Sequence, residues 1–318
     1  MRPAPAPVVA EVVRSGFVEA VHCGVVLAQR ADGDVVLALG DVDEPVFPRS
    51  CNKPLQAAAM VRLGLDLDEE QLAVVAASHS GTDRHVAIVQ SILAAVGLTP
   101  GSLGNATGLP VDEAAAQAVL AAGGGPDQLH QNCSGKHAGM VATCVVRDWP
   151  VDTYFAPDHP LQQGIRATIE ELAAERVAAV GVDGCGAPLF ALSVRGLAHA
   201  FRSLVQAPAP TAEHTVAAAM RAHPDVVGGP GRNVTRLMNG VRGLLAKDGA
   251  EGAFVAALPT GDVAAVKITD GASRAAAPAL VAALRALGVD APVLDDVGRL
   301  PVLGGGRPVG EVRAVARA

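Results

Sequence analysis

The chain has 318 residues, of which 50% are apolar and 18% are charged, and its formal net charge is −7. So large an apolar fraction with so little net charge excludes a mostly disordered chain. The acidic balance, and the lack of a run of lysine and arginine among aromatic residues, disfavour nucleic acid as a partner. No stretch of about 18 uncharged apolar residues occurs, so we expect no membrane-spanning helix.

The cysteines and the first residues indicate the compartment. The five cysteines are odd in number and include no Cys-x-x-Cys pair, a usage unlike the disulfide framework of a secreted protein. Residues 1–16 are rich in proline and carry Arg2, Glu11 and Arg14, so they lack the apolar core of a signal peptide. We therefore expect a soluble, cytoplasmic protein in which residues 1–16 form a flexible N-terminal segment.

The predicted elements begin with a β-hairpin at 17–40, where two runs rich in valine and leucine flank the turn dipeptide Asp32-Gly33. Helices are expected where apolar residues recur at helical spacing, at 69–77, 83–96, 112–122, 137–147, 160–174, 211–222 and 234–241. Strands follow at 253–258 and 263–268, then a helix at 273–287 and a last strand at 309–315.

This order of strands, then helices, then strands predicts an α+β fold. Both chain ends would build one antiparallel sheet, with a helical block inserted between them. No linker-like composition divides the chain. Residues 17–318 are therefore expected to form a single domain.

The first segment with catalytic potential is residues 49–54, Arg-Ser-Cys-Asn-Lys-Pro, ahead of a helical pattern. Ser50 would lie in the first turn of that helix, and Lys53, three residues on, would share its face. A neutral lysine can take the proton of a serine hydroxyl, and Ser-x-x-Lys is the arrangement of penicillin-recognising enzymes. The alternative is a helix-capping serine followed by a surface lysine.

Two further segments offer groups for the same chemistry. Ser78 begins the polar stretch 78–85 between two predicted helices, which is either a capping loop alone or a loop that also carries a site. Lys267 lies in the apolar strand 263–268 and is either a solvent-facing lysine or a second cation near the serine. Two close ammonium groups lower each other's pKa, which would keep one of them neutral and basic.

Cys133 and Cys185 both lie in polar segments that contain glycine. Residues 131–137 combine a thiol, an amine and an imidazole near an expected helix start, where the pKa of a thiol is lowered. The glycines that flank Cys185 indicate a tight turn. A thiolate pair formed by these two residues would favour zinc, whereas two separate, buried thiols would be structural.

Taken together, these segments resemble the rhizobial-type L-asparaginases, also called class 3 or the asparaginase II family. The matching stretches follow the family's order, at 49–54, 77–80, 132–137, 183–185 and 266–271. The resemblance implies a fold like that of serine β-lactamases and glutaminases. It also implies hydrolysis of L-asparagine to L-aspartate and ammonia, in a homodimer.

The same resemblance implies roles for individual residues. Two serine–lysine pairs would serve the reaction, Ser50 with Lys53 and Ser78 with Lys267. The implied zinc ligands are Cys133, Lys136 and Cys185. This zinc would position the substrate or order the pocket instead of supplying the nucleophile. The implied substrate-binding residues are Arg49, His137 and Asp183.

Two rival functions stay open on the sequence alone. Another Ser-x-x-Lys amidohydrolase, such as a glutaminase or a β-lactamase-like enzyme, would share these motifs. A non-catalytic, zinc-dependent protein that binds an amino acid would bind its ligand without releasing ammonia. Turnover of asparagine, glutamine and a chromogenic β-lactam separates the three.

Overall fold

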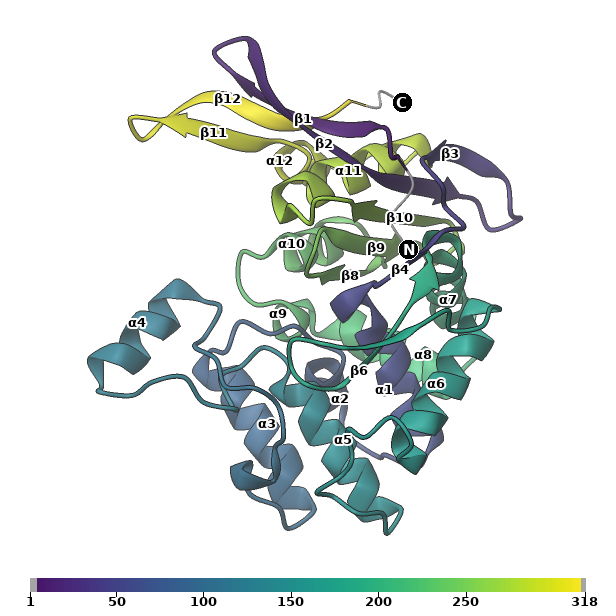
Figure 1. The fold of residues 1–318 in the computed structure, drawn as a ribbon, viewed down its shortest axis with the longest axis vertical. Coiled ribbons are helices and arrows are strands. Elements are labelled where there is room, and N and C mark those ends of the chain that lie inside the picture. The colour runs from purple at the N-terminus through teal and green to yellow at the C-terminus, as the bar shows by residue number, and fades with distance from the viewer. Residues whose placement is uncertain (1–4, 316–318) are drawn as a thin grey trace.

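The computed structural model describes residues 5–315 (Figure 1). An antiparallel sheet occupies one end of the molecule and a block of helices the other. The described part of the sheet has eight strands. Seven of them lie in the order β11 (Leu300–Gly304), β12 (Arg307–Ala314), β1 (Val8–Arg14), β2 (Phe17–Gln29), β10 (Val263–Ile268), β9 (Ala253–Ala257) and β8 (Leu245–Gly249). The eighth, β3 (Val35–Leu39), pairs with β2.

The centre of the sheet is covered on both faces. All of β9 and nearly all of β10 is buried, as expected for strands rich in alanine and valine that have helices on either side. The covering helices are α7 (Val194–Gln206) and α11 (Ser273–Ala286), which both pack against β2, β9 and β10. β10 pairs with β2 and with β9, so the two ends of the chain share one sheet.

The helical block follows a short 3₁₀ turn, η1 (Arg49–Asn52). It contains α1 (Lys53–Arg62), α2 (Glu69–Val75), α3 (Asp83–Ala95), α4 (Glu113–Ala121), α5 (Ser134–Val146), α6 (Pro160–Ala173), α8 (Ala212–Ala222), α9 (Pro224–Val227) and α10 (Asn233–Gly240). Three smaller elements are η2 (Pro100–Ser102), the strand pair β4 (Pro45–Val46) with β7 (Leu192–Ser193), and the pair β5 (Val180–Val182) with β6 (Pro188–Phe190). The last helix, α12 (Val293–Val297), precedes β11.

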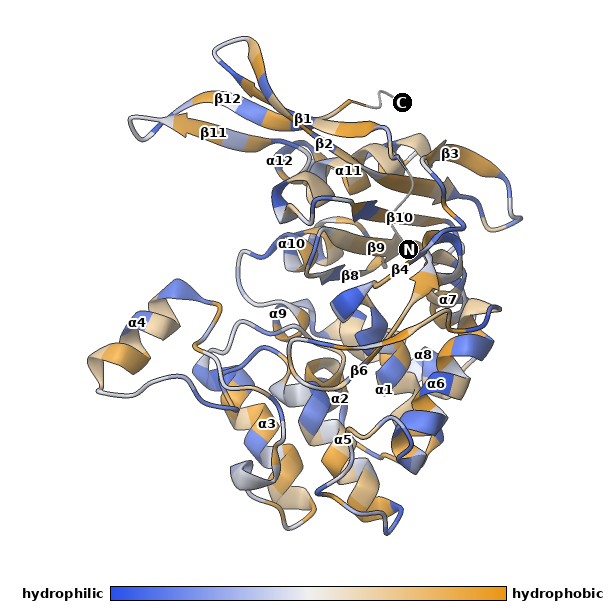
Figure 2. Ribbon diagram, viewed as in Figure 1, coloured by the Kyte–Doolittle hydropathy of each residue, from blue (hydrophilic) through white to orange (hydrophobic). Residues whose placement is uncertain are grey.

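Helix α4 stands away from the body of the protein on an arm (Figure 1). Figure 2 shows that it carries hydrophobic residues, although none of its residues is buried. No helix in the described part of the chain is long and apolar enough to cross a membrane.

The expected α+β class, with a sheet from both chain ends and an inserted helical block, is confirmed. The predicted flexible segment is wrong for residues 8–14, which form β1 between β2 and β12. Residues 1–4 of that segment lie outside the described residues. Three further elements, α7, β8 and β11, were not predicted from the sequence.

Candidate active site

A cavity of about 440 Å³ lies between the sheet and the helical block. Two of the predicted residues, Ser50 and Ser78, border it together. The other lining residues come from four further segments of the chain: Asn132, Gly231, Arg232, Asn233, Asp248, Gly249, Ala250, Ala253, Phe254, Ser273, Ala276 and Ala277. Groups that are distant in the sequence therefore share one small polar chamber.

Two lysines converge on the hydroxyl of Ser78. Lys53 Nζ lies 3.1 Å from Ser78 Oγ, and Lys247 Nζ lies 2.9 Å from the same atom. Both lysines are buried, with 1% and 0% of their surface exposed. Buried lysines lose hydration and so need internal partners. Here Ser78 is a shared partner of the two.

The hydrogen bonds of Lys53 bear on whether its amine can accept a proton from Ser78. Its Nζ donates to two backbone carbonyl oxygens, of Ala77 at 2.6 Å and of Asn132 at 3.2 Å. When Lys53 is neutral, its amine has two N–H groups and one lone pair, and with both N–H groups donated to these carbonyls the lone pair is left for the Ser78 O–H. Burial lowers the pKa of Lys53, although the nearby Cys133 opposes that change. The geometry thus suits Lys53 as the base that accepts the Ser78 proton.

Lys247 is arranged as a charged donor. Its Nζ donates to the carbonyl and to the carboxylate of Asp248, at 2.7 and 2.8 Å, as well as to Ser78. Three acceptors account for all three N–H groups of an ammonium. Burial alone would raise the pKa of Asp248, but the cations of Lys247 and Arg232 hold it well below its usual range. Lys247 would therefore stabilise negative charge on Ser78 Oγ.

The structure places Lys267 elsewhere. Its Nζ donates to the backbone carbonyls of Glu251 and Ile268, and it lines a separate cavity of about 580 Å³. The expected pairing of Ser78 with Lys267 is therefore corrected to a pairing with Lys247. Lys247 was overlooked because β8 was not predicted, although it too follows apolar residues and precedes an Asp-Gly pair.

Ser50 lies in η1, directly before helix α1. Its side chain is partly exposed, and in the described part of the chain no hydrogen bond joins Ser50 Oγ to Lys53. The preceding residue, Arg49, has a φ of +52°, a left-handed conformation that costs free energy in a non-glycine residue and is enriched at active sites. The segment thus holds a free hydroxyl at the cavity on a strained turn.

Arg49 and Asp183, two of the predicted substrate-binding residues, contact each other. Arg49 Nε donates to Asp183 Oδ1 at 2.8 Å, and Arg49 Nη1 lies 3.7 Å from Glu251 Oε1. His137 is placed differently. It is fully buried in the first turn of α5 and hydrogen-bonds Tyr154 through Nδ1, and it is not among the described residues that border the serine cavity.

Two predicted metal ligands come together near that cavity. The ligand atoms of Cys133, Asp183 and Cys185 all lie within 4.8 Å of one another. Lys136 Nζ is 3.0 Å from Cys185 Sγ. The Cys185 thiol lowers the pKa of Cys133, against the effect of burial, and the same interaction raises the pKa of Cys185. The pair therefore has the character of one thiolate and one thiol.

The chemistry of this donor set fits a zinc ion. Zinc binds two or more thiolates with nitrogen or carboxylate ligands at 2.0–2.3 Å in proteins, and donors around such an ion lie within the separation seen here. Asp183 gives Oδ1 to Arg49, while its Oδ2 lies 3.6 Å from Cys185 Sγ. Burial works against the charge of Lys136, but the facing thiols raise its pKa above the usual value. The cluster thus attracts positive charge, as a cation site must.

Comparison with known proteins identifies a matching family and solved structures of low similarity. The family model for L-asparaginase II matches residues 10–314, nearly the whole chain. No curated protein matches significantly. Among solved structures, a provisionally assigned β-lactamase from Bacteroides dorei is 14% identical with a TM-score of 0.42, covering 77% of this chain and 84% of its own. A mutant simvastatin synthase from Aspergillus terreus is 14% identical with a TM-score of 0.34, covering 86% and 87%.

Proposed function

The chain belongs to the L-asparaginase II family, and from that premise we propose that it hydrolyses L-asparagine to L-aspartate and ammonia at the cavity of Ser50 and Ser78. Membership of the family makes the protein an asparaginase-like amidohydrolase. The observation that carries the finer proposal is the convergence of Lys53 and Lys247 on Ser78 Oγ. A hydroxyl between a neutral amine and an ammonium is prepared to pass on a proton.

In the proposed first step, Ser50 Oγ attacks the side-chain amide carbon of asparagine. Ser78 takes the Ser50 proton and gives its own to Lys53. The carbonyl oxygen becomes an oxyanion, and backbone N–H groups at the start of η1 would stabilise it by roughly 3–4 kcal/mol per donor. The proton held by Lys53 then returns through Ser78 to the leaving nitrogen. Ammonia departs and an aspartyl ester of Ser50 is left.

In the second step a water molecule attacks that ester. Lys53 again accepts a proton through Ser78 and returns it to Ser50 Oγ, so aspartate leaves and the site is restored. Lys247 donates to the Asp248 carboxylate at 2.8 Å and to Ser78 Oγ at 2.9 Å. Its hydrogen bond lowers the cost of transient negative charge on Ser78.

Ser50 is assigned as the nucleophile because its hydroxyl is the free one. Ser78 is 4% exposed and held by two lysines, whereas Ser50 is partly exposed to the cavity. The strained turn at Arg49 also supports a functional position for the next residue. The alternative, direct attack by Ser78, makes a different prediction about which serine becomes labelled.

We also propose zinc at the thiol cluster, held by Cys133 and Cys185 with Lys136 or Asp183. When bound, the ion would supply positive charge that keeps both sulfurs as thiolates. The chain's own part is to tie the first turn of α5 to the loop of Cys185. Asp183, which accepts a hydrogen bond from Arg49 Nε at 2.8 Å, would then orient Arg49 beside Ser50.

The expected homodimer and cytoplasmic location belong to this proposal as well. None of the five cysteines forms a disulfide, which supports a reducing compartment. Light scattering coupled to size-exclusion chromatography would give a mass near twice 32.0 kDa for the dimer. A mass equal to one chain would overturn that part of the proposal.

The test of the activity is ammonia release from purified, zinc-loaded protein. We expect turnover of L-asparagine well above that of L-glutamine, and none of a chromogenic β-lactam. Ser50→Ala should lose that turnover, whereas Ser102→Ala, in the partly exposed turn η2 away from the cavity, should keep it. Glutamine or β-lactam turnover above that of asparagine would overturn the substrate assignment.

A further inference from the structure

Arg232 stands at the wall of the serine cavity with most of its guanidinium unengaged. Its side chain is 28% exposed. Nη2 donates to Asp248 Oδ2 at 2.7 Å, and Nη1 is buried without a hydrogen-bond partner in the described part of the chain. A guanidinium has five N–H donors. A buried donor without a partner is costly, so this group is suited to an acceptor that the described part of the chain does not provide.

The charges around the cavity leave a positive excess. Arg232 and Asp248 are the charged residues among those that line it. The other carboxylate oxygen, Asp248 Oδ1, accepts a hydrogen bond from Lys247 Nζ at 2.8 Å. One carboxylate thus serves two cations, and an anion that enters the cavity would balance the second charge.

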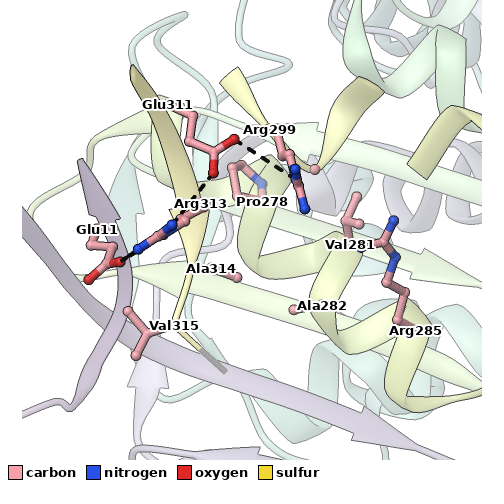
Figure 3. Close-up of a pocket in the computed structure, with 11 residues that line it drawn as sticks. Glu11, Pro278, Val281, Ala282, Arg285, Arg299, Glu311, Arg313, Ala314 and Val315 are labelled. Carbon is pink, nitrogen blue, oxygen red and sulfur yellow. Dashed lines mark hydrogen bonds and ion pairs between the residues drawn. The ribbon is translucent and has the colours of Figure 1, made fainter. Parts of the chain in front are cut away.

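At two other cavities, the arginines leave no such excess of positive charge. Figure 3 shows the cavity beside β12, where Arg313 lies between Glu11 and Glu311 and Arg299 approaches Glu311. Arg49, which lines another cavity, is shared between Asp183 and Glu251. In both places carboxylates of the chain already meet the guanidinium groups.

We propose that Arg232 binds the α-carboxylate of the amino-acid substrate and so restricts the enzyme to amides that carry a free carboxylate at that carbon. Paired N–H donors of a guanidinium match the two oxygens of a carboxylate. Three hydrogen bonds, through Asp248 and Lys247, connect Arg232 to Ser78. The carboxylate and the scissile amide would thus occupy one small chamber. This inference rests on the proposed function.

The test compares L-asparagine with its α-methyl ester, which keeps the side-chain amide but has no α-carboxylate. Ammonia release is measured for both, so only side-chain hydrolysis is counted. For Arg232→Gln we expect kcat/KM for L-asparagine to fall at least 50-fold, mostly through KM. The value for the ester should change less than threefold. Arg232→Lys should show an intermediate loss, since it keeps the charge without the paired donors.

Arg236→Gln is the matched control. Arg236 lies in α10, four residues after Arg232, the N-cap residue of that helix, and pairs with Asp296 at the surface. Arg236→Gln should leave kcat/KM for both substrates, and the ratio of the two values, unchanged. Unfolding temperatures of all variants show whether each is folded, and Arg232→Lys keeps the test available if Arg232→Gln is not.

Two outcomes separate this inference from the proposed function. An equal loss for both substrates in Arg232→Gln would overturn the inference, because Arg232 would then act through Asp248 and Lys247. Absence of ammonia from both substrates with the wild type would overturn the proposed function. Calorimetric titration with L-aspartate would then test whether Arg232 binds a carboxylate. An affinity at least 50-fold weaker in Arg232→Gln than in the wild type would support the carboxylate site. Equal affinities would contradict it.

Discussion

Lys247 and Lys267 are alike in sequence but not in position. Each lies in a strand among apolar residues, shortly before an Asp-Gly pair. In the sheet, however, β9 separates β8 from β10, so only Lys247 reaches Ser78. Sequence spacing cannot distinguish the two, because the distinction depends on which strand lies beside η1. The pairing of β8 beyond β9 decides it.

The two lysines therefore give opposite predictions. Lys247→Met should lower kcat/KM for L-asparagine by about 10³-fold, since it removes the cation beside Ser78. Lys267→Met should keep kcat/KM within about threefold, because its partners are backbone carbonyls outside the cavity. Steady-state ammonia release checks both, with unfolding temperatures as the control. A larger loss of kcat/KM in Lys267→Met than in Lys247→Met would instead support the pairing of Ser78 with Lys267.

Two stacked histidines link stability to pH. His79 and His85 lie with ring centroids 5.1 Å apart and are 0% and 2% exposed. Burial lowers the pKa of both. The unfolded chain therefore binds more protons below its histidine pKa of about 6.5 than the folded chain does. The contribution of these two histidines to the free energy of unfolding is present in full above that pH and is lost as the pH falls below it.

Urea unfolding at pH 7.5 and at pH 5.5 tests this linkage. We expect a lower free energy of unfolding at pH 5.5. In His85→Gln, which keeps a polar side chain but cannot titrate, the decrease should be smaller. An identical decrease in both proteins would show that the histidine stack is not its source.

At the scale of elements, glycine decides how closely helices approach. Helix α5 begins at Ser134, three residues before the predicted start, and Gly135 lies against α2. A Cβ at Gly135 would come within 2.2 Å of the carbonyl oxygen of Val74. Backbone atoms cannot give way as a flexible side chain can. The same turn of α5 carries Lys136, whose Nζ lies 3.0 Å from Cys185 Sγ.

Gly135→Ala should thus be costly. We expect it to lower the free energy of unfolding by about 2 kcal/mol or more, as overpacking does, and to reduce bound metal. Gly164→Ala in α6 is the control, because its Cβ would meet only the end of the Leu63 side chain, at 3.0 Å. Chemical unfolding measures both, and an equal effect of the two substitutions would argue against the backbone clash.

The same scale shows what the sequence can predict. Helices and strands with several apolar residues at regular spacing, such as α3, α11 and the β2–β3 hairpin, were predicted to within a few residues. β8 was missed because only two of its five residues are apolar. β1 was missed because the prolines of residues 1–16 predicted one flexible segment, although residues 8–14 are rich in valine and pair with β2 as well as with β12, about 300 positions away. Local pattern carries no information about such long-range pairing.

At the scale of the whole molecule, the site is assembled from six separate segments around one cavity. The motifs predicted that Lys53, Ser78, Cys133 and Cys185 carry chemistry, and the fold brings Lys53 to Ser78 and Cys133 to Cys185. Lys247 and Arg232 enter from a strand and a turn that no local motif connects to the serines. Their placement follows from the docking of the sheet on the helical block.

The thiol cluster joins the start of α5 to the loop of Cys185, so metal removal should affect the molecule as a whole. We expect about one zinc per chain by elemental analysis, and loss of it in a Cys133→Ala/Cys185→Ala variant. The unfolding temperature should fall with the metal. Cys144→Ala is the control, since Cys144 is buried in α5, outside the cluster. Equal zinc in the double variant and the wild type would exclude these ligands.

The most direct measurement is the identification of the labelled serine. An asparagine analogue with a diazoketone in place of the side-chain amide alkylates an activated nucleophile, and digestion with mass spectrometry locates the label. We expect the label on Ser50, with loss of labelling in Ser50→Ala and strong slowing in Lys247→Met. Label on Ser78, or undiminished labelling of Ser50→Ala, would contradict Ser50 as the nucleophile that Ser78 and its two lysines activate.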